Sequence, residues 1–255
     1  MTYTPEAIAE IEEAFAQLPP LKTEITEAFL SHPFTNASSN EFAHNGLARR
    51  VATLLQCIEN VFHIIPPAQR EPVDNEPRHN AEINIHAFVI GVFGSLDNLA
   101  RIWTLEKDVR NKKGHPLKDG QIGLTPDHEI VRASLKPAMR DYLNGMADWF
   151  TYLIGFRHSL AHRVPLYIPP YTVFNSKVDR YNAIQQELWA AISARNYFKI
   201  QELELEEKTL TTFRAWIARS ANEEPRPVGF HSQLIVDFRT VHEIAMRFIG
   251  DLRAP

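Results

Sequence analysis

The residues of this chain best suited to chemistry are Arg157, His158 and His162, which share the stretch Arg-His-Ser-Leu-Ala-His. An arginine carries a permanent charge on a planar fork of N–H donors that matches the oxygens of a phosphate. A histidine has an ordinary pKa of about 6.5 and can give or take a proton near neutral pH. Together these residue types suit the cleavage of a phosphodiester, so we take Arg157, His162 and His158 as candidate catalytic residues.

A long amphipathic segment leads directly into these residues and must position them. Apolar residues recur at helical spacing from Met139 to Ile154, which predicts that the motif lies on the last turns of a helix. His158 and His162 are four residues apart and share one face of such a helix, whereas Arg157 is rotated away from His162. A local bend at the helix end would bring all three into one cleft.

The motif also resembles that of a known family. An Arg, four intervening residues and a His at the end of an amphipathic helix resemble the Rx4-6H signature of the HEPN superfamily, and the string Phe-Arg-His-Ser-Leu-Ala-His-Arg-Val-Pro-Leu-Tyr resembles bacterial members. The resemblance covers about residues 80–197. It implies an antiparallel helical bundle that pairs with a second copy and, in active members, metal-independent RNA cleavage. By this resemblance His162 would be the acid or base and Arg157 would hold the phosphate, while His158 stands where many members have Asn.

The chemistry of RNA cleavage favours a paired protein. Attack by the ribose 2′-hydroxyl requires a base for that hydroxyl and an acid for the leaving 5′-oxygen. A single His162 cannot easily do both, so we expect a homodimer with two copies of His162 across one cleft, since twofold pairing is the commonest oligomer. The products would be a 2′,3′-cyclic phosphate and a 5′-hydroxyl.

The alternative function is a non-catalytic helical module that binds RNA or a protein partner, or that serves dimerisation. In this interpretation Arg157 and His162 only interact with carbonyl groups at the C-terminus of their helix, where cations are favoured.

Two tyrosines after the motif are candidates for substrate binding. Tyr167 and Tyr171 lie in a proline-rich stretch, residues 164–171, that cannot continue the helix and should be extended. Their rings would either stack on bases or pack this stretch onto the bundle.

Lys112, Lys113 and Asp97 complete the candidate substrate-binding residues. The two lysines belong to a basic stretch, residues 107–118, that is either a phosphate-binding patch or a solvated loop. Asp97 lies beside Asn98 on an otherwise apolar helix, where a polar pair either bonds to a neighbouring helix or faces a functional cleft.

Other site classes find little support in the sequence. His158 and His162 have the spacing of half a metal site, but the adjacent Glu of a zincin motif and a third ligand are absent, so we expect neither a metal ion nor another cofactor. The sequence contains no phosphate-cradling glycine loop and no Gly-x-Ser-x-Gly motif, so it does not resemble an NTPase or a serine hydrolase.

The composition favours an all-α protein. A chain of 255 residues with 44% hydrophobic content can bury a sizeable core, and it has only 10 glycines and no strictly alternating segment typical of strands. The single cysteine, Cys57, cannot form an internal disulfide, and the first residues do not resemble a secretory signal, so we expect a cytoplasmic location. No uninterrupted apolar segment approaches the roughly 20 residues of a membrane helix, since even residues 87–93 are bounded by His86 and Asp97, so we expect no membrane span. With a net charge of −4, the protein as a whole does not attract the negatively charged backbone of a nucleic acid. Contact with RNA would therefore depend on local basic patches.

Helical spacing, N-cap residues and prolines predict the organisation of the chain. We expect an antiparallel helical bundle with additional peripheral helices, forming one domain over residues 1–255: N-terminal peripheral helices in 1–38, a bundle core in 40–200 and a C-terminal helical extension in 201–255. Expected helix starts include Thr4-Pro5, Thr125-Pro126, Pro137 and Ser232.

Overall fold

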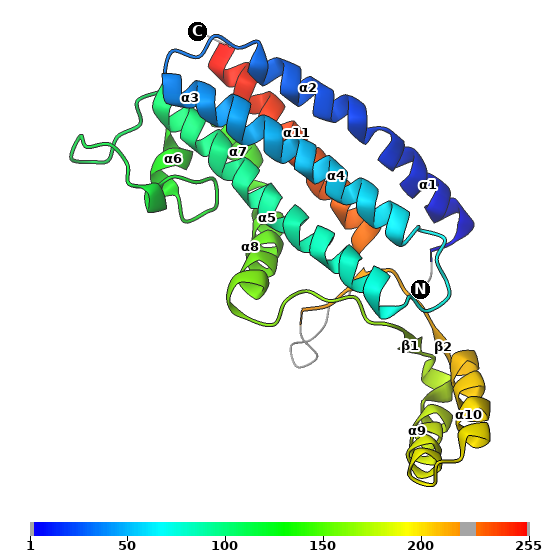
Figure 1. The fold of residues 1–255 in the computed structure, drawn as a ribbon. Helices are drawn as coiled ribbons and strands as arrows, with labels where there is room; N and C mark the ends of the chain where they lie inside the picture. Colours follow the sequence, from blue (N-terminus) through cyan, green and yellow to red (C-terminus); the bar gives the residue numbers. More distant parts are fainter. Residues whose placement is uncertain (1–2, 220–227, 254–255) are drawn as a thin grey trace.

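A computed structural model of the chain describes residues 3–219 and 228–253 and shows the predicted all-α fold (Figure 1). The α-helices are α1 (Pro5–Ala16), α2 (Leu18–Leu30), α3 (Ala37–Glu41), α4 (Ala48–Ile64), α5 (Asn75–Glu106), α6 (Glu129–Ser134), α7 (Pro137–Asn144), α8 (Ala147–His162), α9 (Val178–Ser193), α10 (Tyr197–Leu210) and α11 (Phe230–Arg253). A π-helical turn, Phe42–Leu47, joins α3 to α4, and 3-10 turns occupy Asp119–Gln121 and Asn175–Lys177.

Four two-residue strands complete the secondary structure of the described residues. Strand β1 (Thr172–Val173) pairs antiparallel with β2 (Thr211–Thr212), with Thr172 opposite Thr212. Strand β3 (Trp216–Ile217) pairs antiparallel with β4 (Val228–Gly229). These short pairs hold connections between helices and do not form a layer of their own.

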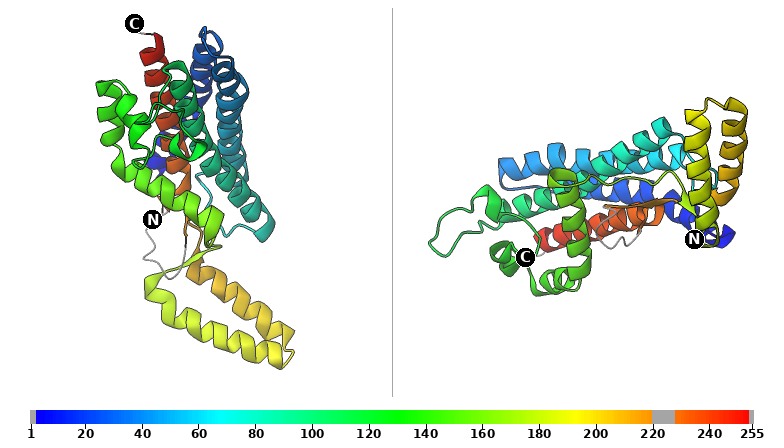
Figure 2. Two further views of the ribbon diagram at one scale, coloured as in Figure 1. Left: turned by 90° about the vertical axis from the view of Figure 1, so that its left-hand side faces the viewer. Right: turned by 90° about the horizontal axis from the view of Figure 1, so that it is seen from below.

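The bundle is built on α2, α4, α5 and α11, which lie side by side in two views (Figures 1 and 2). Each contributes an apolar face to one continuous core, because residues three and four apart fall on the same side of a helix. Residues 1–38 and 201–255 were expected at the periphery, but α2 and α11, which fall in these ranges, are bundle helices. Phe29 of α2 and Phe238 and Phe248 of α11 are buried in the core.

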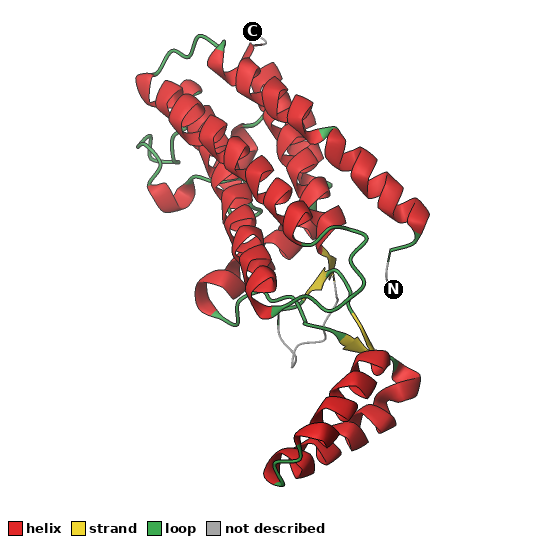
Figure 3. Ribbon diagram, turned by 45° about the vertical axis from the view of Figure 1, so that its right-hand side comes forward, coloured by secondary structure: helices red, strands yellow, loops and turns green. Residues whose placement is uncertain are grey.

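The α9–α10 hairpin projects away from the bundle, although all of α9 falls in the range expected for the bundle core (Figure 3). It has a separate small cluster of buried apolar residues, formed by Ile184, Ala191, Leu203 and Leu210. Arg180 of α9 joins the two helices at the surface through its ion pair with Glu206 of α10, and it also pairs with Glu187 of its own helix.

Two of the predicted helix starts, Thr4-Pro5 and Pro137, are confirmed. The other two, Thr125-Pro126 and Ser232, are wrong. The Thr4 hydroxyl accepts from the Ala7 N–H at 3.2 Å and caps α1, and Pro137 begins α7. The Thr125 hydroxyl instead bonds to His128 Nδ1 at 2.7 Å, and α6 begins later, at Glu129. Likewise Ser232 lies inside α11, which already begins at Phe230.

Helix α5 is the one helix of the described chain that is long and apolar enough to cross a membrane. Its most apolar window has a mean hydropathy of 1.3, and 61% of that window is buried within the protein. This burial is what the central helix of a bundle requires.

Candidate functional site

Helix α8 carries the Arg/His motif and packs one side on the bundle, where Phe150, Leu153 and Phe156 are buried. The helix stays regular to its end, because the Arg163 N–H still donates to the Ser159 carbonyl at 3.2 Å. The bend considered from the sequence is therefore not present. Residues five apart on a regular helix point in directions about 140° apart, so Arg157 and His162 of one chain do not converge.

The Arg157 side chain turns toward α5. Its guanidinium carbon lies 5.1 Å from the centre of the Phe93 ring, a distance typical of a cation–π contact. Asp97 lies one turn further along α5 on the same side, as the two positions are four residues apart. Arg157 thus lies beside Asp97, so the structure brings two of the predicted site residues together.

The surroundings of Asp97 affect the pKa of its carboxyl group. Although the residue is accessible to solvent, the surrounding protein desolvates its carboxyl and raises its pKa, and the positive charges of Arg157, His128, Arg101 and Arg50 oppose that rise. We name these five residues the α5–α8 polar cluster. It combines one carboxyl group with a majority of cationic side chains and can therefore attract an anion.

Arg50, Arg101 and His128 of this cluster were not selected from the sequence. Arg50 Nε donates to Asn98 Oδ1 at 2.9 Å, so Asn98 bonds across to a neighbouring helix, one of the two roles expected for the polar pair. A Cβ at Gly94 would lie 2.3 Å from Arg50 Nη1, so glycine leaves room for the guanidinium in this position. The four-residue spacing of Asp97 and Arg101 was the available signal, since it places both on one face of α5.

The two histidines of the motif face away from the polar cluster. His158 and His162 are exposed, and their ring centres lie 6.3 Å apart, as neighbours on one helix face. Within residues 3–219 and 228–253, no three His, Cys, Asp or Glu side chains gather in a way that could hold a metal ion. The motif thus divides into an arginine that contacts α5 and a histidine pair that faces solvent.

The two candidate tyrosines contact other parts of the protein. Tyr167 exchanges two backbone hydrogen bonds with Ala218, at 3.1 and 3.0 Å. The Tyr171 hydroxyl lies 2.6 Å from the hydroxyl of Tyr181 on α9. The stretch after α8 is free of helix, as its prolines predict. The Tyr171 contact favours the packing role for that ring over base stacking, whereas the Tyr167 bonds involve only its backbone.

The candidate lysines lie far from the histidines. Lys112 and Lys113 are exposed in the loop that follows α5 and projects from the end of the bundle (Figure 1). The end of α8 lies beside the other half of α5, where His86 Nε2 bonds to the Leu166 carbonyl at 2.7 Å. About 30 Å of helix separates His86 from Glu106. The structure therefore does not bring these lysines to the motif.

Comparison with models of protein families, with curated proteins and with solved structures finds no match. Function is therefore inferred from the chemistry of the site.

Proposed function

We propose that this protein is a metal-independent endoribonuclease of the HEPN type, in which two copies of the chain form one active site with the α8 motif. The observation that carries the proposal is the exposure of Arg157, His158 and His162 together on the last turns of one helix. Among the described residues, the Arg157 side chain has a ring contact with Phe93 but forms no hydrogen bond, so its N–H donors are available for a phosphate.

In the proposed reaction, His162 of one copy removes the proton of the ribose 2′-hydroxyl, whose oxygen attacks the adjacent phosphorus. The bond from phosphorus to the 5′-oxygen breaks, and His162 of the second copy protonates that oxygen. Arg157 stabilises the charge on the phosphate oxygens. Because Arg157 and His162 of one chain point about 140° apart, a site that uses both residue types needs groups from two copies.

A second candidate function is supported by the α5–α8 polar cluster. Arg157 contacts Phe93 and lies beside Asp97, instead of turning toward His162. With Arg50, Arg101 and His128 close to the same carboxyl group, the cluster suits the binding of an RNA backbone without cleavage. The protein would then be an RNA-binding or dimerising module.

The test is cleavage of RNA by the purified full chain in the presence of EDTA. We expect products with 2′,3′-cyclic phosphate and 5′-hydroxyl ends, and loss of at least about a hundredfold in rate in His162→Ala, since acid–base catalysis contributes about 10²–10⁴-fold. Arg157→Ala should lose activity similarly, and His158→Ala tests the second exposed histidine. Circular dichroism should show an unchanged helix content in each variant.

Matched controls are His63→Ala, which removes an exposed histidine of α4, and Arg247→Ala, which removes an arginine placed 4.0 Å from the Tyr142 ring. Both should cleave like the wild type. Full activity in both Arg157→Ala and His162→Ala would contradict the nuclease proposal. A wild-type protein that binds RNA as a dimer but does not cleave it would establish the second candidate instead.

Mixing of chains tests the composite site. If both copies of His162 are required, a mixture with one quarter wild-type and three quarters His162→Ala chains contains only about one sixteenth wild-type dimers after subunit exchange. Activity should fall to that level. A fall to one quarter would show that each chain acts alone.

A further inference from the structure

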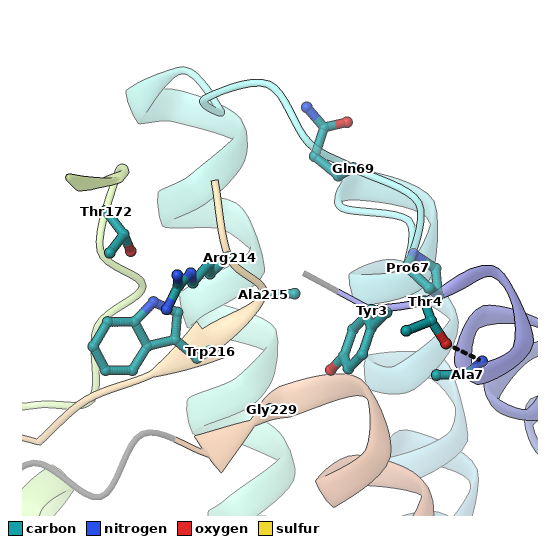
Figure 4. Close-up of a pocket in the computed structure, with 10 residues that line it drawn as sticks. All are labelled: Tyr3, Thr4, Ala7, Pro67, Gln69, Thr172, Arg214, Ala215, Trp216 and Gly229. Carbon is teal, nitrogen blue, oxygen red and sulfur yellow. Dashed lines mark hydrogen bonds between the residues drawn. The ribbon is translucent and has the colours of Figure 1, made fainter. Parts of the chain in front are cut away.

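A cavity lies outside the α8 motif, where the N-terminal segment, the loop after α4 and the strands at the base of the α9–α10 hairpin meet (Figure 4). Its volume is about 460 Å³, within the range of about 300–1,000 Å³ typical of small-molecule sites. Much of the lining is apolar and comes from Ala7, Pro67, Ala215 and the rings of Tyr3 and Trp216.

Four polar atoms of the residues that line this cavity are buried and have no hydrogen-bond partner among residues 3–219 and 228–253, and one of them is the Tyr3 hydroxyl oxygen. The other three are Thr172 Oγ1, Arg214 Nε and Trp216 Nε1. Figure 4 shows their side chains together at one side of the cavity, with Tyr3 across from them. Native proteins pair nearly all such buried atoms, because leaving one unpaired is unfavourable.

The chemistry of these atoms defines the kind of group that they can bind. The indole and guanidinium nitrogens can only donate, and the threonine hydroxyl can donate as well as accept. Arg214 also carries a permanent positive charge. The group that these atoms can bind is therefore an acceptor, and a negative charge on it is favoured. A carboxylate offers two oxygens, which together accept several hydrogen bonds.

The donors are held by backbone pairing, so the arrangement is built into the fold. Thr172 pairs with Thr212 between β1 and β2, and Trp216 pairs with Gly229 between β3 and β4. The segment before Arg214 is fixed by the Phe213 N–H, which donates to the Arg70 carbonyl at 3.0 Å.

Gly229 has a specific part in forming the wall opposite these donors. A Cβ at this position would lie 2.8 Å from the Tyr3 hydroxyl oxygen. Glycine thus allows the Tyr3 ring to close the far side of the cavity.

We propose that this cavity binds a small organic monocarboxylate with an aromatic or aliphatic body. The carboxylate accepts from Arg214, Trp216 and Thr172, and the apolar body lies against Tyr3 and Pro67. Inorganic phosphate fits less well, because Arg214 is the one cationic side chain among the described lining residues and the apolar walls would stay uncovered. This proposal does not depend on the activity of the α8 motif.

The test follows the four tryptophan indole N–H signals of the ¹⁵N-labelled full chain during titration with indole-3-acetate. We expect a saturable shift of the Trp216 signal, identified by its absence in Trp216→Phe. Neutral indole-3-acetamide should bind at least about tenfold more weakly, because it lacks the charge that Arg214 recognises. Inorganic phosphate should leave the signal unchanged.

Calorimetry on variants provides the second measurement. Arg214→Gln and Thr172→Val should weaken the binding of indole-3-acetate, by roughly tenfold or more for the charged partner. Arg49→Gln, at an exposed position of α4, should not. If Arg214→Gln fails to fold, the wild-type titration still decides.

Three results would overturn the proposal. The first is the absence of a saturable Trp216 shift with indole-3-acetate, phenylacetate and hexanoate up to about 10 mM. A dissociation constant above this concentration would be too weak for a specific site. The second is equal affinity for the acid and the amide. The third is unchanged affinity in a folded Arg214→Gln protein.

Discussion

The helical bundle and the α9–α10 hairpin differ strongly in how many of their apolar residues they bury. The bundle shares one continuous core that reaches from α1 to α11. The hairpin has a core of four buried residues and leaves large side chains in solvent, including Trp189 at 71% exposure and Phe198 at 80%. Free energy of folding follows buried apolar area, so the bundle should unfold as one unit and the hairpin should open more readily.

This difference bears on both proposed sites. The α8 motif and the α5–α8 polar cluster lie on the bundle, whereas the cavity lies where the chain leaves the bundle for the hairpin. A weakened hairpin should therefore spare the motif. Three substitutions test this contrast.

The largest effect is expected for Phe238→Ala in the bundle. Phe238 is completely buried on α11, and loss of its ring should lower the free energy of unfolding of the whole protein by about 3–5 kcal/mol. Chemical denaturation measures the change. Val236→Ala, on the exposed side of the same helix, is the control and should have little effect. Equal losses in the two variants would contradict the assignment of α11 to the core.

A smaller, pH-dependent effect is expected for Asp237→Asn. Asp237 is buried and accepts from Trp149 Nε1 and Gln233 Nε2, both through Oδ1. Burial raises the pKa of its carboxyl to about 7. The folded state therefore binds more protons than the unfolded state between about pH 4 and 7, and the wild type should lose stability as the pH rises through that window.

Asparagine keeps the acceptor at Oδ1 without a charge, so Asp237→Asn should be more stable than the wild type by about 2–4 kcal/mol at pH 8 and equally stable near pH 4. His231 acts in the opposite direction, since burial lowers its pKa to about 4 and its stabilisation is lost as the pH falls from about 6.5. Because His231 is present in both proteins, its contribution cancels in the difference in stability between Asp237→Asn and the wild type. Asp141→Asn, at an exposed position, should show no such difference, and a pH-independent gain would refute the role of ionisation.

The smallest effect on the whole protein is expected for Leu203→Ala in the hairpin. The substitution should lower the free energy of unfolding of the hairpin by about 2 kcal/mol. This value is at the low end of the range for a buried leucine, because so small a core can relax around the lost side chain. Hydrogen exchange should accelerate over residues 178–210 and stay slow in α4 and α5. Leu205→Ala removes a leucine that is 66% exposed in the same helix and serves as the control. Faster exchange throughout the bundle would show that hairpin and bundle unfold together.

Local patterns of the sequence determined much of this protein. Apolar spacing and prolines predicted most helices, and the cap formed by Thr4 with Pro5 was predicted correctly, because these signals act within one or two turns. The motif from Arg157 to His162 was visible for the same reason, since its residues are close neighbours in the chain.

Contacts between distant segments were decided by the tertiary structure alone. No local pattern shows that α11 belongs in the core, that Arg157 turns toward Phe93 and Asp97, or that Arg50 and His128 approach the same carboxyl group. The cavity is the clearest case, because Thr172, Arg214 and Trp216 meet there only after two strand pairs have formed. Apolar spacing determines which side of a helix is buried, but it does not specify the partner against which that side packs.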